Sequence, residues 1–163
     1  MKKLTLTLCL ILTTGLLYGQ HNDHTGHDNM SNSTDVEAVK KVLKSYKNAL
    51  ESLDVSDTKK LFSDDANIFE NGSYEGTYQE YLDHHIGPEL GHFKEFSFDN
   101  YKVDVRMEGD MAVAYETYTY KIVTGGDDSR TIERQGVATS VLKKIDGNWK
   151  IIQNHGSSRA LKK

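Results

Sequence analysis

The chain of 163 residues has a single cysteine and fewer basic than acidic side chains. Cys9 lies in an apolar amino-terminal stretch with no small residue just before it, so we do not expect a lipid-anchored start. If that stretch is removed on export, no thiol remains, which excludes disulfides and cysteine nucleophiles. The 20 basic residues stand against 24 acidic ones, and the net charge of −4 gives nucleic-acid binding no electrostatic support.

The amino terminus has the pattern of an export signal. Lys2 and Lys3 precede a mostly apolar run over residues 4–17. Gly19 and Gln20 follow, in a region where a signal peptidase would cleave. The run is short for a membrane span and typical of a secretory signal. We therefore expect residues 1–20 to be a cleaved signal peptide and the protein to be periplasmic or secreted, with no membrane attachment after cleavage. The alternative is an uncleaved anchor.

Residues 21–33 are polar and lack hydrophobic periodicity, which predicts a flexible tail. The tail holds histidines at a spacing of three, with two aspartates and Met30 nearby: His21, His24 and His27. Imidazole and thioether groups are ligands for copper or zinc, and the stretch resembles the His/Met-rich tails of exported copper-handling proteins. The tail is therefore either a site for a divalent metal or a hydrophilic spacer.

Helical patterns come first in the predicted domain, residues 34–163. Thr34 and Glu37 form a capping-box pattern ahead of an apolar stripe at three/four spacing: Val36, Val39, Leu43, Tyr46, Leu50 and Leu53. A short helix is expected over residues 56–62. A second capping box, Thr77 with Glu80, starts another helix that should end near Gly87-Pro88, because proline cannot continue a helix.

Strand patterns follow the helices. A short strand at Ile68 and Phe69 precedes an Asn71-Gly72 turn, and four longer strands are expected over residues 96–107, 111–124, 131–143 and 149–155. Glycine-containing turns separate the long strands, as in hairpins. Helices followed by an antiparallel sheet indicate an α+β domain. A curved sheet wrapped on the long helix would leave an open end, where a pocket forms.

The stretch from Tyr46 to Ala66 carries a family resemblance. It contains Ala49-Leu50, Asp54, Leu61-Phe62 and Ser63-Asp64-Asp65-Ala66, and residues 146–151 read Asp-Gly-Asn-Trp-Lys-Ile. These segments resemble the opening and the last hairpin of nuclear transport factor 2-like proteins, which include ketosteroid isomerases, scytalone dehydratase and SnoaL-like polyketide cyclases. The resemblance implies an α+β cone with a pocket, and a homodimer. The fold hosts many activities.

The resemblance to ketosteroid isomerases extends to two positions. An ungapped count places Tyr46 on the tyrosine that donates a hydrogen bond to the developing enolate oxygen. The same count places Glu70 on the general base. Those enzymes also keep a protonated acid in a late strand, whereas the comparable stretch here, residues 140–142, has none. The alternative readings are a packed tyrosine and a solvated strand-end glutamate.

Histidines supply further candidates. His85 continues the apolar stripe of the second helix, so we expect it to point inward, as a proton relay or as a satisfied semi-buried histidine. His84 would then lie at the rim, and His92 lies in a loop beyond Pro88.

In the last strand, alternation places one set of residues on a single face, which its apolar members mark as the inner one: Trp149, Ile151, Gln153, His155 and Ser157. His155 would be a second relay at the cavity mouth. Arg159 could meet an anion. Ligand contacts are therefore expected from six residues: His84, His92, Trp149, Gln153, Ser157 and Arg159.

These patterns favour an exported domain that binds a small, partly apolar ligand without a required cofactor. If it is an enzyme, we expect proton transfer beside a carbonyl, with Glu70 as base, Tyr46 as oxyanion donor, and His85 or His155 as relay. One alternative is a copper- or zinc-handling protein that uses the tail and the pocket histidines. Another is a non-catalytic dimerisation module whose cavity is filled.

Overall fold

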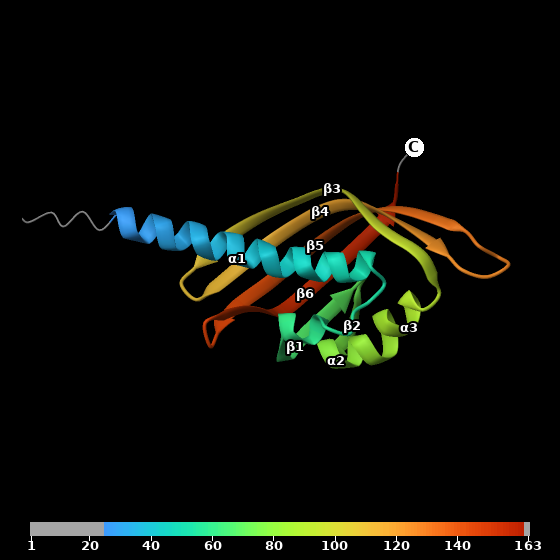
Figure 1. The fold of residues 1–163 in the computed structure, drawn as a ribbon, viewed down its shortest axis with the longest axis horizontal. Helices are drawn as coiled ribbons and strands as arrows, with labels where there is room; N and C mark the ends of the chain where they lie inside the picture. Colours follow the sequence, from blue (N-terminus) through green and yellow to red (C-terminus); the bar gives the residue numbers. More distant parts are fainter. Residues whose placement is uncertain (1–24, 162–163) are drawn as a thin grey trace, which may run out of the picture.

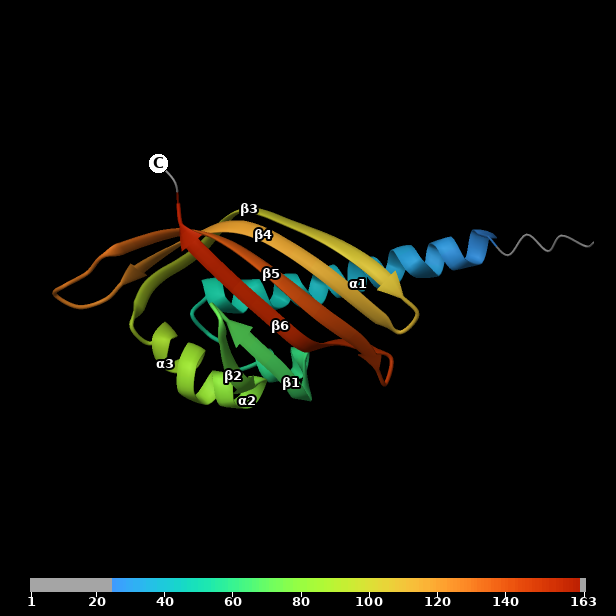
Figure 2. The same ribbon diagram turned by 180° about the vertical axis from the view of Figure 1, so that it is seen from behind.

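The computed structural model describes the backbone of residues 25–161 and the side chains from residue 32 onward. Six strands form one curved sheet in the order β2-β1-β6-β5-β4-β3, and helix α1 lies along its concave face (Figures 1 and 2). The bounds are α1 (Thr25–Glu51), β1 (Phe62–Glu70), β2 (Ser73–Thr77), β3 (Phe93–Glu108), β4 (Met111–Thr124), β5 (Thr131–Ile145) and β6 (Asn148–Ala160). The predicted α+β cone is confirmed.

Helix α1 begins earlier than expected. It starts at Thr25, so the Thr34–Glu37 pattern lies inside the helix, and the predicted start at Thr34 is wrong. A capping-box spacing favours a start but does not stop a helix from continuing when no proline precedes it. The predicted tail therefore overlaps α1 from residue 25 onward. Its first residues, 21–24, and the predicted signal peptide lie outside the described residues, so cleavage and export stay predictions.

The segment between β2 and β3 is helical throughout. It consists of α2 (Tyr78–Tyr81), a π-helical turn η2 (Leu82–Ile86) and α3 (Gly87–Leu90). The Thr77–Glu80 capping box is confirmed, because each side chain bonds the backbone of the other. The predicted end at Gly87-Pro88 is wrong. The Gly87 N–H donates to the Leu82 carbonyl, and this wider turn accommodates Pro88 within the first turn of α3.

The long strands pair as predicted through hairpins, with β1 alone running parallel to its neighbour β6. A short 3-10 helix η1 (Thr58–Leu61) occupies the segment where a short helix was expected. Strand β2 was not predicted. It pairs with β1 across a two-residue turn in which Asn71 (φ 49°) and Gly72 (φ 94°) both have positive φ. This conformation matches the twist of a hairpin and favours Asn-Gly.

The concave face of the sheet has two different ends. Where the first half of α1 crosses it, apolar side chains fill the interior, and we call this region the packed end: Val39, Leu142, Trp149 and Ile151. The Trp149 indole N–H donates to Asp35 of α1 at 3.0 Å, and Lys144 bonds the same carboxylate at 2.7 Å. Near the carboxyl end of α1, beside α2 and α3, the interior instead contains a cavity, and we call this region the cavity end.

Candidate functional site

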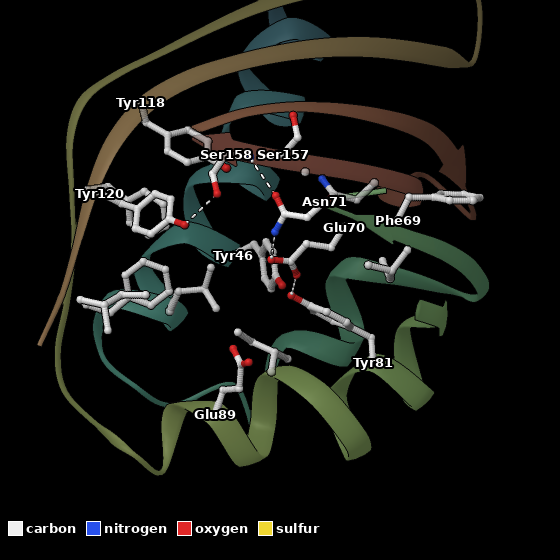
Figure 3. Close-up of a pocket in the computed structure, with 18 of the residues that line it drawn as sticks. Tyr46, Phe69, Glu70, Asn71, Tyr81, Glu89, Tyr118, Tyr120, Ser157 and Ser158 are labelled. Atoms are coloured by element: carbon white, nitrogen blue, oxygen red, sulfur yellow. Dashed lines mark hydrogen bonds between the residues drawn. The ribbon is translucent and has the colours of Figure 1, made fainter. Parts of the chain in front are cut away.

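The cavity has a volume of about 170 Å³ and lies between α1, the β1–β2 turn, α2–α3 and the inner face of β3, β4 and β6 (Figure 3). Its wall is mainly aromatic. Eight aromatic residues line it: Tyr46, Phe69, Tyr81, Phe93, Phe96, Phe98, Tyr118 and Tyr120. Polar groups enter from a few points, chiefly Glu70, Asn71, Glu89, Asn154 and Ser158. The filled-cavity alternative does not fit this interior.

Glu70 stands at the end of β1, immediately before the Asn71-Gly72 turn. The Tyr81 hydroxyl donates to Glu70 Oε2 at 2.6 Å, and the Asn71 amide donates to Oε1 at 3.3 Å. The side chain is 34% exposed and lines the cavity. The strand end, the turn and α2 therefore hold one carboxylate at the cavity wall, in place of the solvated strand-end glutamate.

Tyr81 is fixed by the short helix α2, whose capping box sets its start. Burial raises the pKa of the Tyr81 hydroxyl well above its usual value, and the nearby Tyr46 and Glu70 raise it further. The hydroxyl therefore stays protonated and serves as a permanent donor to Glu70. The resemblance gave this tyrosine no role, and only its place on the helical stripe could have pointed to it.

Tyr46 lies on the inward side of α1 and lines the same cavity as Glu70. Its ring packs edge-on against Phe62 and Tyr78, which stack on each other. Burial raises the pKa of the Tyr46 hydroxyl well above its usual value, with further contributions from Tyr78 and Glu70. Tyr46 is therefore both a packed tyrosine and a protonated hydroxyl at the cavity.

His85 lies on the π-helical turn, outside the cavity lining but in contact with Glu70. Its ring stacks on Tyr81 at a centroid distance of 5.0 Å. Its Nε2 lies 3.8 Å from Glu70 Oε2 and 3.6 Å from Glu89 Oε1, and its Nδ1 lies 3.1 Å from Glu75 Oε2. The structure thus brings His85 to the base candidate and links it to two further carboxylates, of which Glu89 is more exposed than Glu70 and Glu75 is less exposed.

His155 does not join this group. Strand β6 contains a bulge, because Ile151 pairs with Leu142 while Gln153 pairs with Val141, the next residue along β5. One extra residue turns every later side chain to the other face. Gln153, His155 and Ser157 are therefore exposed, and the prediction that they face inward is wrong. Past the bulge the inner positions of β6 are Asn154, Gly156 and Ser158, all of which line the cavity.

The remaining predicted ligand contacts lie away from the cavity wall. Trp149 is buried as expected, but at the packed end. His84 and His92 are exposed, and Arg159 is exposed and bonds Gln135 across the strands. Ser157 is the one of the six that borders the cavity, at its rim.

Sequence reasoning missed a buried acid, Glu116 of β4. The Tyr101 hydroxyl donates to it at 2.6 Å, and Ser140 Oγ approaches its other oxygen at 3.4 Å. Burial raises the pKa of the Glu116 carboxyl despite these hydrogen bonds. A chamber of about 60 Å³ beside it shares Tyr46, Tyr118 and Asn154 with the main cavity. In the sequence, Glu116 alternates with Ala112 and Ala114, and this alternation was the signal that could have predicted its inward position.

The structure offers no metal site in the part of the chain that it describes. Within that part, no three histidine, cysteine or acidic side chains are grouped to hold a metal ion. The pocket-metal hypothesis required Glu70, His85 and His155 together, and the bulge separates His155 from the other two. His21 and His24 lie outside the described residues, as does the side chain of His27, so metal binding by the tail stays a prediction. None of the described helices is long and apolar enough to cross a membrane.

Comparison with known proteins agrees with this architecture. The SnoaL-like domain family matches residues 39–161. No curated protein matches the chain in sequence. Among solved structures, a nuclear transport factor 2-like superfamily protein from Salmonella enterica serovar Typhimurium superposes with a TM-score of 0.71 at 20% identity, over 81% of this chain and 96% of that one.

Two further solved structures are similar. A conserved protein from Planctomyces limnophilus has a TM-score of 0.68 at 19% identity, covering 79% of this chain and 99% of its own. A candidate ketosteroid isomerase from Shewanella frigidimarina has a TM-score of 0.60 at 25% identity, covering 74% and 94%. These likenesses support the fold, and homodimer formation stays a prediction.

Proposed function

We propose that this chain, which belongs to the SnoaL-like domain family, binds a small, partly apolar molecule in its cavity and moves a proton beside a carbonyl group of that molecule. The observation that carries the proposal is that Glu70, a carboxylate held by Tyr81, and Tyr46, a protonated hydroxyl, line one cavity of otherwise mainly apolar wall. A base and an oxyanion donor around one cavity are the two groups that enolisation requires.

The proposed step conserves charge. The Glu70 carboxylate takes a proton from the carbon next to the carbonyl, and the electron pair of the broken C–H bond moves to form the enolate. The carbonyl oxygen gains the negative charge and accepts a hydrogen bond from the Tyr46 hydroxyl. The protonated Glu70 then returns the proton to the same carbon or to a conjugated one.

His85 would serve this step from outside the cavity lining. Because His85 Nε2 lies near both Glu70 and the more exposed Glu89, and its Nδ1 lies near Glu75, it offers a route by which the base can exchange protons with solvent. This role is the relay expected for His85. His155 has no part in it.

Hydrogen–deuterium exchange tests the proposal. Exchange of the α-hydrogens of cyclohexanone in D₂O, followed by proton NMR, should be accelerated by the protein. Glu70→Gln should slow the catalysed exchange by about 10²–10⁴-fold, since it removes the base. Tyr46→Phe should slow it by about 10²–10³-fold, as expected for the loss of one oxyanion donor.

Two substitutions of the same kind serve as matched controls. Glu108→Gln, at the exposed end of β3, and Tyr74→Phe, on a tyrosine that is 59% exposed, should leave the exchange rate unchanged. Thermal unfolding of each variant checks that it is folded. Equal rates for Glu70→Gln and the unaltered protein would remove Glu70 from the mechanism and contradict the proposal.

A further inference from the structure

The cavity presents an aromatic wall on one side and carboxylates on another. Strands β3 and β4 contribute the rings, which touch one another: Phe96 stacks on Phe98 at 4.8 Å, and Tyr120 lies 5.7 Å from Phe96 and 6.3 Å from Phe98. Figure 3 shows Tyr118 and Tyr120 together on one side of the cavity. Glu70 and Glu89 lie on other sides of it, and the Glu89 carboxylate is turned toward the cavity.

The aromatic wall depends on a specific residue of the neighbouring strand. Gly136 of β5 pairs with Tyr118, and a Cβ at this position would lie 2.2 Å from the tyrosine ring. Only glycine therefore lets the Tyr118 ring lie against the sheet in this way.

The charge around the cavity is negative. Two carboxylates line it, those of Glu70 and Glu89, and no lysine, arginine or histidine is among the described residues of its lining. Two other basic side chains contact residues of the lining, Lys47 against Phe98 and Arg134 against Ser158. Lys47 pairs with Glu51 at 2.7 Å. Arg134 pairs with Tyr120 on the inner face of the sheet and donates to Ser158 Oγ at 2.9 Å. Its positive charge therefore offsets part of the negative charge but is outnumbered by the carboxylates of Glu70, Glu75 and Glu89.

His85 does not cancel this charge. It contacts three carboxylates, those of Glu70, Glu75 and Glu89, so the group stays net negative even when the imidazole is protonated. The carboxylates would therefore repel an anionic ligand, and a neutral ligand would gain no electrostatic attraction from them.

We infer that the ligand of this cavity carries a positively charged nitrogen, as an alkylammonium or quaternary ammonium group. The faces of aromatic rings attract such a cation, and the attraction grows when water is excluded. The carboxylates offset the cost of desolvating the charge. The inference rests on the proposed function, since it names the class of molecule that the proposed cavity takes, namely a carbonyl compound with a cationic nitrogen.

One ammonium group of the chain already lies against aromatic rings in this part of the sheet. The Lys47 ammonium lies 5.5 Å from the centroid of the Phe98 ring and 5.6 Å from that of Tyr101. Phe98 is also part of the cavity lining. The size agrees too, because a cavity of about 150 Å³ holds a benzene molecule, and a trimethylammonium group on a short chain is of similar bulk.

A pair of molecules of the same shape tests the inference. Choline and its neutral carbon isostere, 3,3-dimethylbutan-1-ol, would be titrated into the protein and followed by NMR, with cyclohexanone as a neutral carbonyl probe. Choline should bind at least about tenfold more tightly than the alcohol if cation–π and carboxylate contacts act together. Added salt should weaken choline binding more than alcohol binding.

Variants locate the effect. Glu89→Gln, at a side chain that is 53% exposed, should weaken choline binding and leave the alcohol unaffected. Tyr120→Leu removes one ring of the cavity wall and should weaken choline binding more than alcohol binding. Glu108→Gln removes an equal charge far from the cavity and should change neither affinity.

The outcomes separate this inference from the proposed function. Equal or tighter binding of the alcohol overturns the cationic ligand and leaves a ligand-binding cavity standing. Binding of cyclohexanone alone does the same. A choline preference that survives both Glu89→Gln and Tyr120→Leu unchanged would place the cation elsewhere on the chain and also overturn it. If none of the three molecules binds, both the inference and the proposed function fail.

Discussion

The two ends of the cone use the same helix and the same sheet for different purposes. At the packed end, aliphatic side chains and Trp149 fill the interior, and the indole N–H is satisfied by Asp35. At the cavity end, rings, hydroxyls and carboxylates surround an unfilled volume. Filling an interior stabilises a fold. A binding site instead requires unfilled space and buried polar groups, and both lower the stability of the fold. The contrast indicates that α1 and the sheet are held together at one end so that the other can stay hollow.

The largest difference between the ends should appear on truncation of a packed-end side chain. Leu142 and Ile151 have no exposed surface, so Leu142→Ala or Ile151→Ala should lower the free energy of unfolding by about 2–5 kcal/mol. Urea denaturation measures the loss. The folded fraction should bind cavity ligands with unchanged affinity. A loss of less than about 1 kcal/mol would mean that the packed end does not hold the cone together.

A smaller effect, specific to the cavity end, concerns the pH dependence of stability. The pKa of Glu116 is raised in the folded protein, so the unfolded chain loses this proton first as pH rises above about 4.5. The carboxyl therefore lowers the stability of the fold progressively as pH rises from there through its raised value. In Glu116→Gln this fall should be absent, so that the variant gains stability relative to the unaltered protein on going from pH 4 to pH 7.

Urea denaturation over that pH range checks the sign. Glu108→Gln serves as a control in which an exposed carboxylate is lost but the buried network of Glu116, Tyr101 and Ser140 remains. If the unaltered protein gains stability relative to Glu116→Gln as pH rises, the carboxyl is stabilised as an anion and the account of it is wrong.

The smallest expected effect tests which side of β6 faces the cavity. The Asn154 amide donates to Ser140 Oγ at 2.8 Å and lines the cavity, whereas the neighbouring His155 is exposed. Asn154→Ala should lower the free energy of unfolding by about 1 kcal/mol, as for a lost hydrogen bond, and should alter ligand affinity. His155→Ala should do neither. The reverse pattern would mean that the strand has no bulge in solution.

Much of the fold could be predicted because its signals are local. Alternation predicted four long strands, the glycine-containing turns between them predicted hairpins, Asn71-Gly72 predicted a turn, and the Thr77–Glu80 box marked the start of α2. The places where prediction failed depend on pairing that one segment cannot reveal. The bulge in β6 exists only relative to β5, and the turn that accommodates Pro88 depends on a wider hydrogen bond.

The candidate site was predicted in part for the same reason. Tyr46 and Glu70 were assigned through the family resemblance, and the structure places both at one cavity. Tyr81 and Glu116 were not predicted, because their roles arise from contacts between α2 and Glu70 of β1 and between Glu116 of β4 and Tyr101 of the neighbouring strand β3. His155 was placed on the wrong face because one extra residue reverses alternation.

The most direct test of the account is a map of where a ligand binds. In a two-dimensional NMR titration of the isotope-labelled protein with choline, the largest amide shifts should fall on the Glu70–Asn71 turn, on β3 and β4 near Phe98 and Tyr120, and at Ser158. The indole signal of Trp149 should stay unmoved, because it belongs to the packed end. Shifts centred on Trp149, or on the exposed outer face around His155, would contradict the division of the cone into a packed end and a binding end.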